Sequence, residues 1–246
     1  MTVFDPDPSL RWLFCMTHPD DEISICVWIH RLTQAGAEVW ISWTHDTPVR
    51  QAEARDVASN LGVGDGRLVF HGAPDGLVID HLGDLHPKFR DMMERIAPDR
   101  VVCGAFEQGH LDHDATNWLV NRSTQATVLE APFYHPYTTR FPRVNRFAEL
   151  GQGEAKIELD TAERAFKKQI ARSYPSQRIW LNMMAAEMRA RVVGDGSLLG
   201  EEWLRPQPET DYREPRLPSR LAERVRRSSP WARWSAALDR LPADLR

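Results

Sequence analysis

The sequence predicts an α/β fold: a mostly parallel sheet with helices on both faces. Two observations support this. Apolar runs of strand length alternate with segments whose apolar residues recur at helical spacing, and 42% of the 246 residues are apolar, enough for a sizeable core. Such alternation is typical of βαβ units, whose right-handed crossovers bring successive parallel strands into one sheet.

The first elements are bounded by clear start and stop signals. A short apolar run predicts a strand over residues 11–17. A helix over 21–35 follows, because its apolar residues recur every three or four positions and Gly36 is a suitable C-terminal stop. A strand over 38–44 and a helix over 50–61, closed by another glycine, repeat the unit.

The same pattern continues more weakly toward the C-terminus. A short strand over 67–71, a helix over 82–96 that ends before Pro98, and a strand over 100–104 come next. After them the sequence predicts, in order, a helix over 114–122, a strand over 126–134, a loop or hairpin over 138–153, a helix containing Ala165, Phe166 and Ile170, and a helix over 176–192.

The net charge of −4 is unevenly distributed. Residues 205–246 contain ten arginines and six acidic residues, a local excess of four positive charges. We interpret this tail as an ion-paired, solvated surface rather than an anion-binding one, and expect no nucleic-acid partner. Its Pro-rich beginning, 205–218, is expected to run extended over the surface. The expected organisation is an α/β domain over 1–204 with an irregular C-terminal appendage over 205–246.

Composition also bears on location. No apolar run approaches the roughly 20 residues of a membrane span, and the first residues lack the basic-then-apolar layout of a signal peptide. Cys15, Cys26 and Cys103 fall inside apolar segments, which predicts buried free thiols. We therefore expect a cytoplasmic protein without a membrane span.

Two polar clusters follow predicted strands. Residues 18–22 read His-Pro-Asp-Asp-Glu, and residues 109–114 read Gly-His-Leu-Asp-His-Asp. In an open α/β sheet the ligand crevice lies beyond the carboxyl ends of the strands, where the strand order reverses. We expect the two clusters to converge there on one site.

The residue types in these clusters are those of a catalytic zinc centre, which has three protein ligands and an open position for water. We assign His18, Asp21 and His113 as the ligands of one divalent ion. Zinc is the expected metal, and other divalent cations suit the same ligand types. Such an ion lowers the pKa of water to about 7 and polarises an acyl oxygen.

The neighbouring side chains have the chemistry of a hydrolase. Asp20 is the expected general base, and His110 is expected to stabilise the oxyanion and to protonate the leaving amine. Asp112 is expected to orient an imidazole. Histidines that end predicted strands are expected to line the cleft (His45, His71 and His135), and the others are expected at the surface (His30, His81 and His86).

Each cluster also has a plain structural explanation when taken alone. The acidic residues at 20–22 could cap a helix, and the second cluster could be a polar helix start. The occurrence of both clusters after strands favours the metal site. A nucleotide-binding domain is disfavoured, because carboxylates replace the Gly-x-Gly-x-x-Gly turn that would hold phosphate.

The motifs at 17–22 and 109–114 resemble the LmbE-like (PIG-L) family of zinc-dependent N-deacetylases. The similarity extends over about residues 11–190. It implies a Rossmann-like fold and an enzyme that removes an acyl group, usually acetyl, from an amino sugar or related conjugate. Weaker similarities lie at 50–53, 61–63, 74–76 and 174–177.

The resemblance implies the same roles for the residues of the two clusters and adds two sugar contacts, Arg50 and Asp75. A guanidinium and a carboxylate can each bind vicinal hydroxyls, although a helix-start ion pair and a turn are alternative roles. Two positions depart from the family. Leu111 stands where proline is frequent, and Gln108 lies where an aromatic hydroxyl often precedes the second cluster. Either Gln108 supplies a neutral donor to the substrate, or His110 and the metal suffice.

The sequence thus predicts a zinc-dependent amide hydrolase acting on a small N-acylated amino sugar or glycosyl conjugate. Two alternatives stay open: the same site acting on a thiol, lipid-linked or antibiotic conjugate, and a module that binds metal or sugar without chemistry. The presence of every ligand and of the base disfavours the second. A homo-oligomer is left open.

Overall fold

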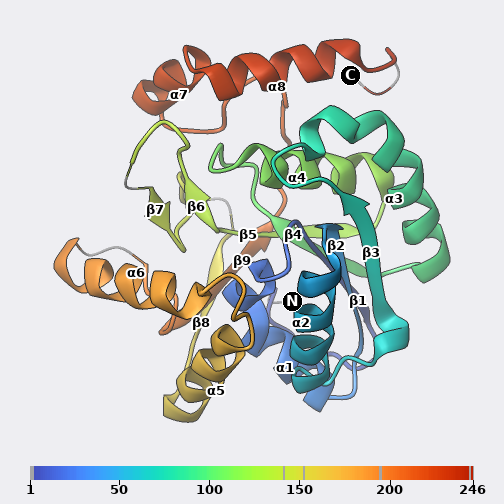
Figure 1. Ribbon diagram of the computed structural model, residues 1–246, viewed down its shortest axis with the longest axis vertical. Coiled ribbons are helices and arrows are strands. Elements are labelled where there is room, and N and C mark those ends of the chain that lie inside the picture. Colours follow the sequence, from blue (N-terminus) through green and yellow to red (C-terminus); the bar gives the residue numbers. More distant parts are fainter. Residues whose placement is uncertain (1–2, 141, 152, 194–195, 244, 246) are drawn as a thin grey trace.

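The computed structural model describes residues 3–140, 142–151, 153–193, 196–243 and 245. Within these residues a seven-stranded sheet has the order β3-β2-β1-β4-β5-β9-β8 (Figure 1). Its strands are β1 (Arg11–Met16), β2 (Glu38–His45), β3 (Leu68–Ala73), β4 (Arg100–Gly104), β5 (Thr127–Ala131), β8 (Ala155–Glu158) and β9 (Glu201–Pro206). A separate small hairpin joins β6 (Tyr134–His135) to β7 (Arg143–Val144).

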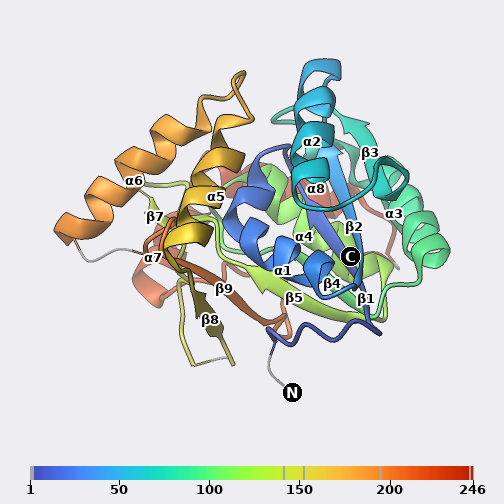
Figure 2. The same ribbon diagram turned by 90° about the horizontal axis from the view of Figure 1, so that it is seen from below.

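Helices cover both faces of the sheet (Figures 1 and 2). The α-helices are α1 (Cys26–Gln34), α2 (Pro48–Asn60), α3 (Leu82–Ile96), α4 (Leu111–Ser123), α5 (Thr161–Arg172), α6 (Ile179–Val193), α7 (Ser219–Arg226) and α8 (Ser229–Arg240). Short 3-10 helices are η1 (Asp21–Ile25), η2 (Asp65–Arg67) and η3 (Val78–His81). Strands β1 to β5 are mutually parallel, β9 runs antiparallel to β5, and β8 runs antiparallel to β9. This mostly parallel sheet confirms the predicted α/β class.

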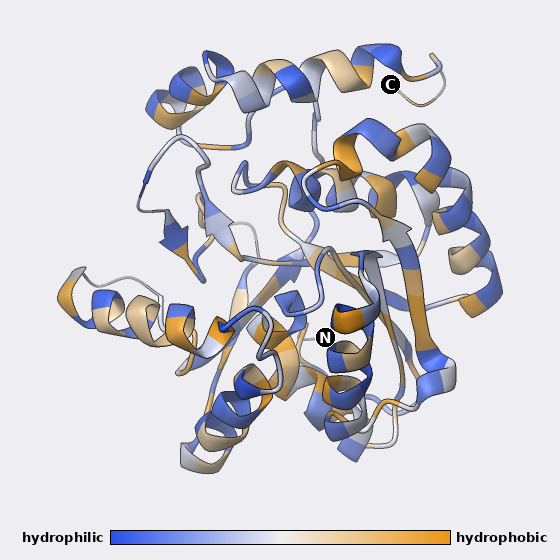
Figure 3. Cartoon of the chain, viewed as in Figure 1, coloured by the Kyte–Doolittle hydropathy of each residue, from blue (hydrophilic) through white to orange (hydrophobic). Residues whose placement is uncertain are grey.

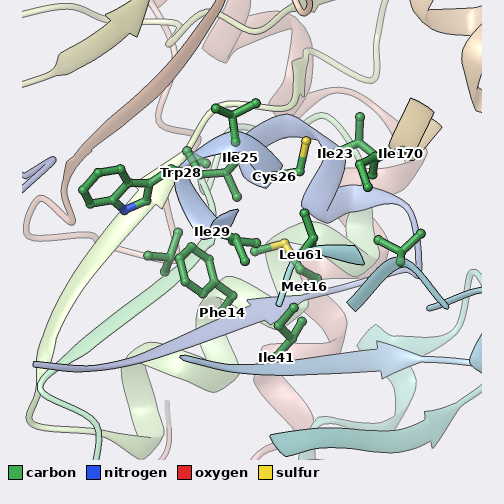
Figure 4. Close-up of a cluster of buried hydrophobic side chains, with 14 of the residues drawn as sticks. Phe14, Met16, Ile23, Ile25, Cys26, Trp28, Ile29, Ile41, Leu61 and Ile170 are labelled. Atoms are coloured by element: carbon green, nitrogen blue, oxygen red, sulfur yellow. The ribbon is translucent and has the colours of Figure 1, made fainter. Parts of the chain in front are cut away.

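Alternate residues of β1 belong to two buried clusters, one on each face of the sheet. Phe14 and Met16 pack with residues of α1 and α2, whereas Leu13 and Cys15 pack with residues of α3, α4 and α8. Figure 4 shows the first cluster, with Phe14 and Met16 beneath side chains of η1 and α1. Because both faces are covered, the central strands are apolar runs, and this is why they could be predicted.

Two predicted elements are divided in the structure. The helix predicted over 21–35 begins as η1 and becomes α-helical only at Cys26. The strand predicted over 126–134 leaves the sheet after Ala131, since the Phe133 N–H donates to the Glu107 carboxylate at 2.7 Å and not to a strand partner.

The prediction that 205–218 runs over the surface is wrong at its start, because Arg205 lies buried in β9 and pairs with Glu130 of β5. Beside it in the same strand, Glu202 is also fully buried and pairs with Lys167 of α5 at 2.8 Å. Charged residues disfavour a strand in sequence-based reasoning, but these charges are tolerated because each has a partner.

The C-terminal helices α7 and α8 cover the cluster formed with α3 and α4. Trp231, Trp234 and Leu238 are buried, and the Trp234 indole donates to the Tyr212 carbonyl at 2.8 Å. The division at residue 204 stays a prediction, and β9 spans that position. As expected for an ion-paired tail, several arginines pair with acids: Arg213 with Asp239, Arg226 with Glu214, Arg227 with Glu223, and Arg233 with Asp80.

Two further sequence predictions concern buried thiols and membrane spans. Cys15, Cys26 and Cys103 are free and buried, as predicted. Among the described residues, no helix combines the length and the apolar character needed to cross a bilayer.

Candidate metal centre and active site

The two polar clusters meet at one edge of the sheet. Strands β1 and β4 pair directly, and β2 and β5 continue the sheet in opposite directions, so the strand order reverses between them. The first cluster follows β1 and the second follows β4, which brings together residues about 95 positions apart in sequence: His18 and His113.

The potential ligand atoms of three side chains form a compact triangle, in which a different oxygen of the carboxylate faces each imidazole. His18 Nδ1 lies 3.3 Å from His113 Nε2 and 3.6 Å from Asp21 Oδ2, and His113 Nε2 lies 3.4 Å from Asp21 Oδ1. A tetrahedral zinc ion with ligand distances of about 2.0–2.2 Å requires edges of roughly 3.4 Å. The distances among the predicted ligands are therefore compatible with one divalent cation.

The carboxylate of this triangle is held in place by the backbone. Asp21 Oδ2 accepts the N–H of His18 at 2.8 Å and that of Thr17 at 3.1 Å. Burial alone would raise the pKa of Asp21, but His113 and His18 outweigh it and hold the pKa well below its usual range. The side chain is thus an anionic donor facing two imidazoles.

Asp20 differs from Asp21 although the two are adjacent. Its φ of 126° is unusual for a residue other than glycine and turns its side chain toward Arg50, whose Nη2 donates to Asp20 Oδ2 at 3.1 Å and to the Pro19 carbonyl at 2.8 Å. Burial and then the Asp21 charge raise the pKa of Asp20 well above its usual range, against the opposing effect of Arg50. A carboxylate with a raised pKa is a better proton acceptor.

Glu22 anchors this turn from inside the protein. It is fully buried, and its carboxylate accepts the indole N–H of Trp43 at 3.1 Å, the Asp20 N–H at 3.2 Å, and the Tyr174 hydroxyl. Burial raises the pKa of Glu22. Sequence reasoning treated Glu22 as one of several capping acids and missed this role. The signal was Tyr174, within the weakly similar segment 174–177.

The second cluster begins helix α4. His110 is the N-cap, and its Nδ1 accepts the Asp112 N–H at 3.2 Å. Burial and then His113 lower the pKa of His110 to about 4, so the imidazole is neutral near neutral pH. The ring centroid of His110 lies 5.3 Å from that of His18 and 5.2 Å from that of His113.

Asp112 links the metal cluster to the loop after β3. Its carboxylate accepts the N–H groups of Gly76 at 2.7 Å and Val78 at 3.1 Å, and lies 3.6 Å from His18 Nε2. Asp75, in the same loop, lies 3.3 Å from His18 Nε2 with a side chain that is 63% exposed. It therefore stands at the solvent-facing mouth of the site.

Gln108 is not brought to the cluster by any contact among the described residues. Its side chain is fully buried, and Oε1 accepts the Arg216 N–H of the C-terminal segment at 2.9 Å. Its own backbone N–H donates to Asp114 at 3.2 Å. These contacts hold the loop before His110 and leave the role of Gln108 as a substrate donor a prediction.

Among the remaining histidines, His45 lies beside the proposed ligands, with its ring 5.5 Å from that of His18. His86, predicted at the surface, is buried beside the Trp118 ring and lies 3.1 Å from the Arg122 carbonyl. The prediction failed because the spacing of apolar residues in α3 does not show which face of α3 is covered by α4.

The loop after β5 closes the other side of His113. The rings of Phe133 and Tyr134 lie 5.1 Å and 5.2 Å from the imidazole. Gly109 makes this contact with the loop feasible, because a Cβ there would lie 1.6 Å from the Tyr134 carbonyl oxygen. Sequence reasoning missed both aromatic residues.

Comparisons with known proteins agree with this geometry. The family model described as PIG-L: GlcNAc-PI de-N-acetylase matches residues 13–123, which confirms the resemblance drawn from the motifs. No curated protein sequence matches the chain.

Solved deacetylase structures share the fold. A deacetylase of the teicoplanin biosynthetic pathway has a TM-score of 0.62 and 18% identity, covering 82% of this chain and 99% of that chain. The zinc-inhibited form of teicoplanin deacetylase has a TM-score of 0.58 and 18% identity, covering 82% and 99%. The N,N'-diacetylchitobiose deacetylase of Pyrococcus horikoshii has a TM-score of 0.52 and 18% identity, covering 82% and 86%.

Proposed function

We propose that this protein, whose residues 13–123 match the PIG-L family model, is a metal-dependent amide hydrolase that removes an N-acyl group from an amino sugar or glycosyl conjugate. The observation that carries the proposal is the close approach of His18, Asp21 and His113. Their ring nitrogens lie 3.3 Å apart, and each lies 3.6 or 3.4 Å from a different oxygen of the Asp21 carboxylate. The deacetylases of similar fold support it.

The same three residues would hold one divalent cation, for which zinc is proposed. The ligand set has two imidazoles and one carboxylate, both suited to zinc. The cation would supply Lewis-acid activation of water and of the amide carbonyl.

In the proposed reaction Asp20 and His110 have separate tasks. Asp20 accepts a proton as the water oxygen attacks the carbonyl carbon, and returns it to the nitrogen as the C–N bond breaks, giving a carboxylic acid and a free amine. Since Nδ1 of neutral His110 accepts a backbone N–H, its proton resides on Nε2 and can be donated to the developing oxyanion.

The remaining residues position these groups and the substrate. Asp112 lies beside His18 Nε2 and is proposed to orient that ring. Arg50 orients Asp20, and Arg50 and Asp75 are proposed to bind sugar hydroxyls at the mouth. Gln108 supports the loop before His110 through its Oε1, and its amide is proposed as a neutral donor to the substrate.

The test combines metal binding with amine release. Protein stripped of metal is titrated with Zn²⁺ by calorimetry, and primary amine is measured with N-acetylglucosamine and N,N'-diacetylchitobiose. Asp20→Asn is expected to keep metal and lose at least about 100-fold in kcat, whereas His113→Ala is expected to lose metal. His81→Ala, at a half-exposed histidine beside Asp84, is the matched control and should resemble wild type.

Each alternative has its own outcome. Full activity of Asp20→Asn would reject the base assignment. Binding of metal and sugar without amine release would support a non-catalytic module. Release of amine only from a larger antibiotic or thiol conjugate would instead identify such a conjugate as the substrate class. An antibiotic conjugate is the second candidate, because deacetylases of an antibiotic pathway have a similar fold.

A further inference from the structure

A cavity with mostly apolar walls opens directly beside the proposed base and one proposed metal ligand. Its volume is about 320 Å³, and Asp20 and Asp21 form its polar edge. Ile23 and Phe133, both nearly inaccessible to solvent, line it from the sheet side, and Met183 lines it from α6. A cavity of this size, lined by apolar groups at the edge of a polar site, is typical of a ligand pocket.

The cavity adjoins the proposed sugar contact Arg50 only through Asp20, and Asp75 does not line it. Arg50, Asp75 and His110 are not among its lining residues, and Asp75 faces His18 Nε2, whereas the triangle of ligand atoms uses His18 Nδ1. If the sugar lies toward Asp75, the other substituent of the amide carbonyl must lie away from the sugar. The acyl group is that substituent.

An acetyl group would leave most of this space unfilled. A single methyl group cannot reach both the Phe133 side and the α6 side of a 320 Å³ cavity. The wall from α6 includes Met183, whose unbranched side chain adapts to ligands of different shape. Figure 3 shows hydrophobic residues along α6, the helix that closes this side.

We propose that the cavity binds the acyl chain and that the enzyme prefers N-acyl groups longer than acetyl. This rests on the proposed amidase function and names its substrate class. Each methylene transferred from water to an apolar site contributes about 0.8 kcal/mol, which corresponds to about a fourfold increase in kcat/KM per methylene. The increase should stop when the cavity is full.

The test measures kcat/KM for amine release from N-acetyl-, N-butyryl-, N-hexanoyl- and N-decanoylglucosamine. We expect a rise of about 16-fold from acetyl to butyryl, since two methylenes are added, and a further rise to hexanoyl. Highest activity with acetyl and a steady loss with length would overturn the proposal while leaving the deacetylase intact. Absence of amine release from all four would instead reject the amidase function on these sugars.

Variants locate the effect in the cavity. Ala186→Phe adds a ring to the α6 wall and should lower the hexanoyl-to-acetyl ratio of kcat/KM at least about tenfold, and Met183→Ala should shift the optimum to longer chains. Met188→Phe, on the same helix but 68% exposed and not a lining residue, is the matched control. If Ala186→Phe and Met183→Ala leave the ratio unchanged, or alter only the KM of aryl glycosides of N-acetylglucosamine, the acyl assignment is wrong.

Discussion

Replacing Gly109 with alanine tests whether a backbone contact positions His110, the proposed donor to the oxyanion. A Cβ at this position would lie 1.6 Å from the Tyr134 carbonyl oxygen and 2.7 Å from its carbonyl carbon. Cβ atoms essentially never approach closer than 3.0 Å, so the two segments must separate by at least 1.4 Å. The obstacle is backbone and cannot rotate away. His110 is the next residue, so its imidazole must move with the loop.

A displacement of about 1 Å in a catalytic group can cost about 100-fold in rate, and we expect a loss of that order in kcat/KM for Gly109→Ala. The assay is amine release from the best N-acyl substrate, with Zn²⁺ affinity and thermal unfolding measured in parallel. Gly83→Ala is the matched control, because a Cβ there meets nothing within 4 Å and lies in α3, where alanine is favoured by about 1 kcal/mol. Wild-type kcat/KM together with wild-type Zn²⁺ affinity in Gly109→Ala would refute the reasoning.

Three further predictions concern the support of the site and of the fold. Lys167→Met should lower the free energy of unfolding in urea by about 3–5 kcal/mol, because it leaves the buried Glu202 without its cation; a change below about 1 kcal/mol would contradict this. Tyr174→Phe removes a donor from the buried Glu22 carboxylate and should cost about 1–3 kcal/mol in the same assay, and an unchanged midpoint would count against the anchoring role. Burial, and then Lys88, lower the pKa of His71 to about 4, so between pH 6.5 and about 4 the unfolded chain binds a proton that the folded chain does not. The free energy of unfolding should therefore fall as pH decreases through this window, by on the order of 3 kcal/mol. His71→Phe can keep the stacking on Phe89 and should show a smaller decline. Stability-versus-pH curves of equal slope for wild type and His71→Phe would refute this.

The central strands were predictable because burial on both faces makes them continuous apolar runs. Strand β9 was missed because its sequence contains Glu201, Glu202 and Arg205. The partners that make these charges acceptable in a sheet lie far away in sequence: Lys167 in α5 and Glu130 in β5. No local pattern shows that a charge will find such a partner, so the sequence could not reveal this strand.

The proposed ligands were predictable for a topological reason. His18 and His113 follow strands that the switch in strand order makes neighbours, so two local motifs were sufficient. The support of the site was not predictable in this way. Glu22 is held by Tyr174 from a segment 152 positions later, and the loop at Gly109 is packed on Tyr134. Both contacts depend on loop conformations, which periodicity does not specify.

The adjacent carboxylates Asp20 and Asp21 show how one turn can provide two different functions. Both are largely buried, which by itself raises the pKa of each, yet Asp21 faces two imidazoles and its pKa falls, while Asp20 faces the Asp21 charge and its pKa rises. Two like groups whose environments separate their pKa values are the usual arrangement for dividing chemical tasks. The φ of 126° at Asp20 makes the separation geometrically feasible, because it directs consecutive side chains toward Arg50 and toward the histidines. Strain of about 1–3 kcal/mol at such a residue persists only where surrounding contacts hold it, and the Glu22 carboxylate that accepts the Asp20 N–H is one of them. The buried glutamate at the end of the motif therefore belongs to the proposed machinery as a positioning residue, through the backbone of the proposed base.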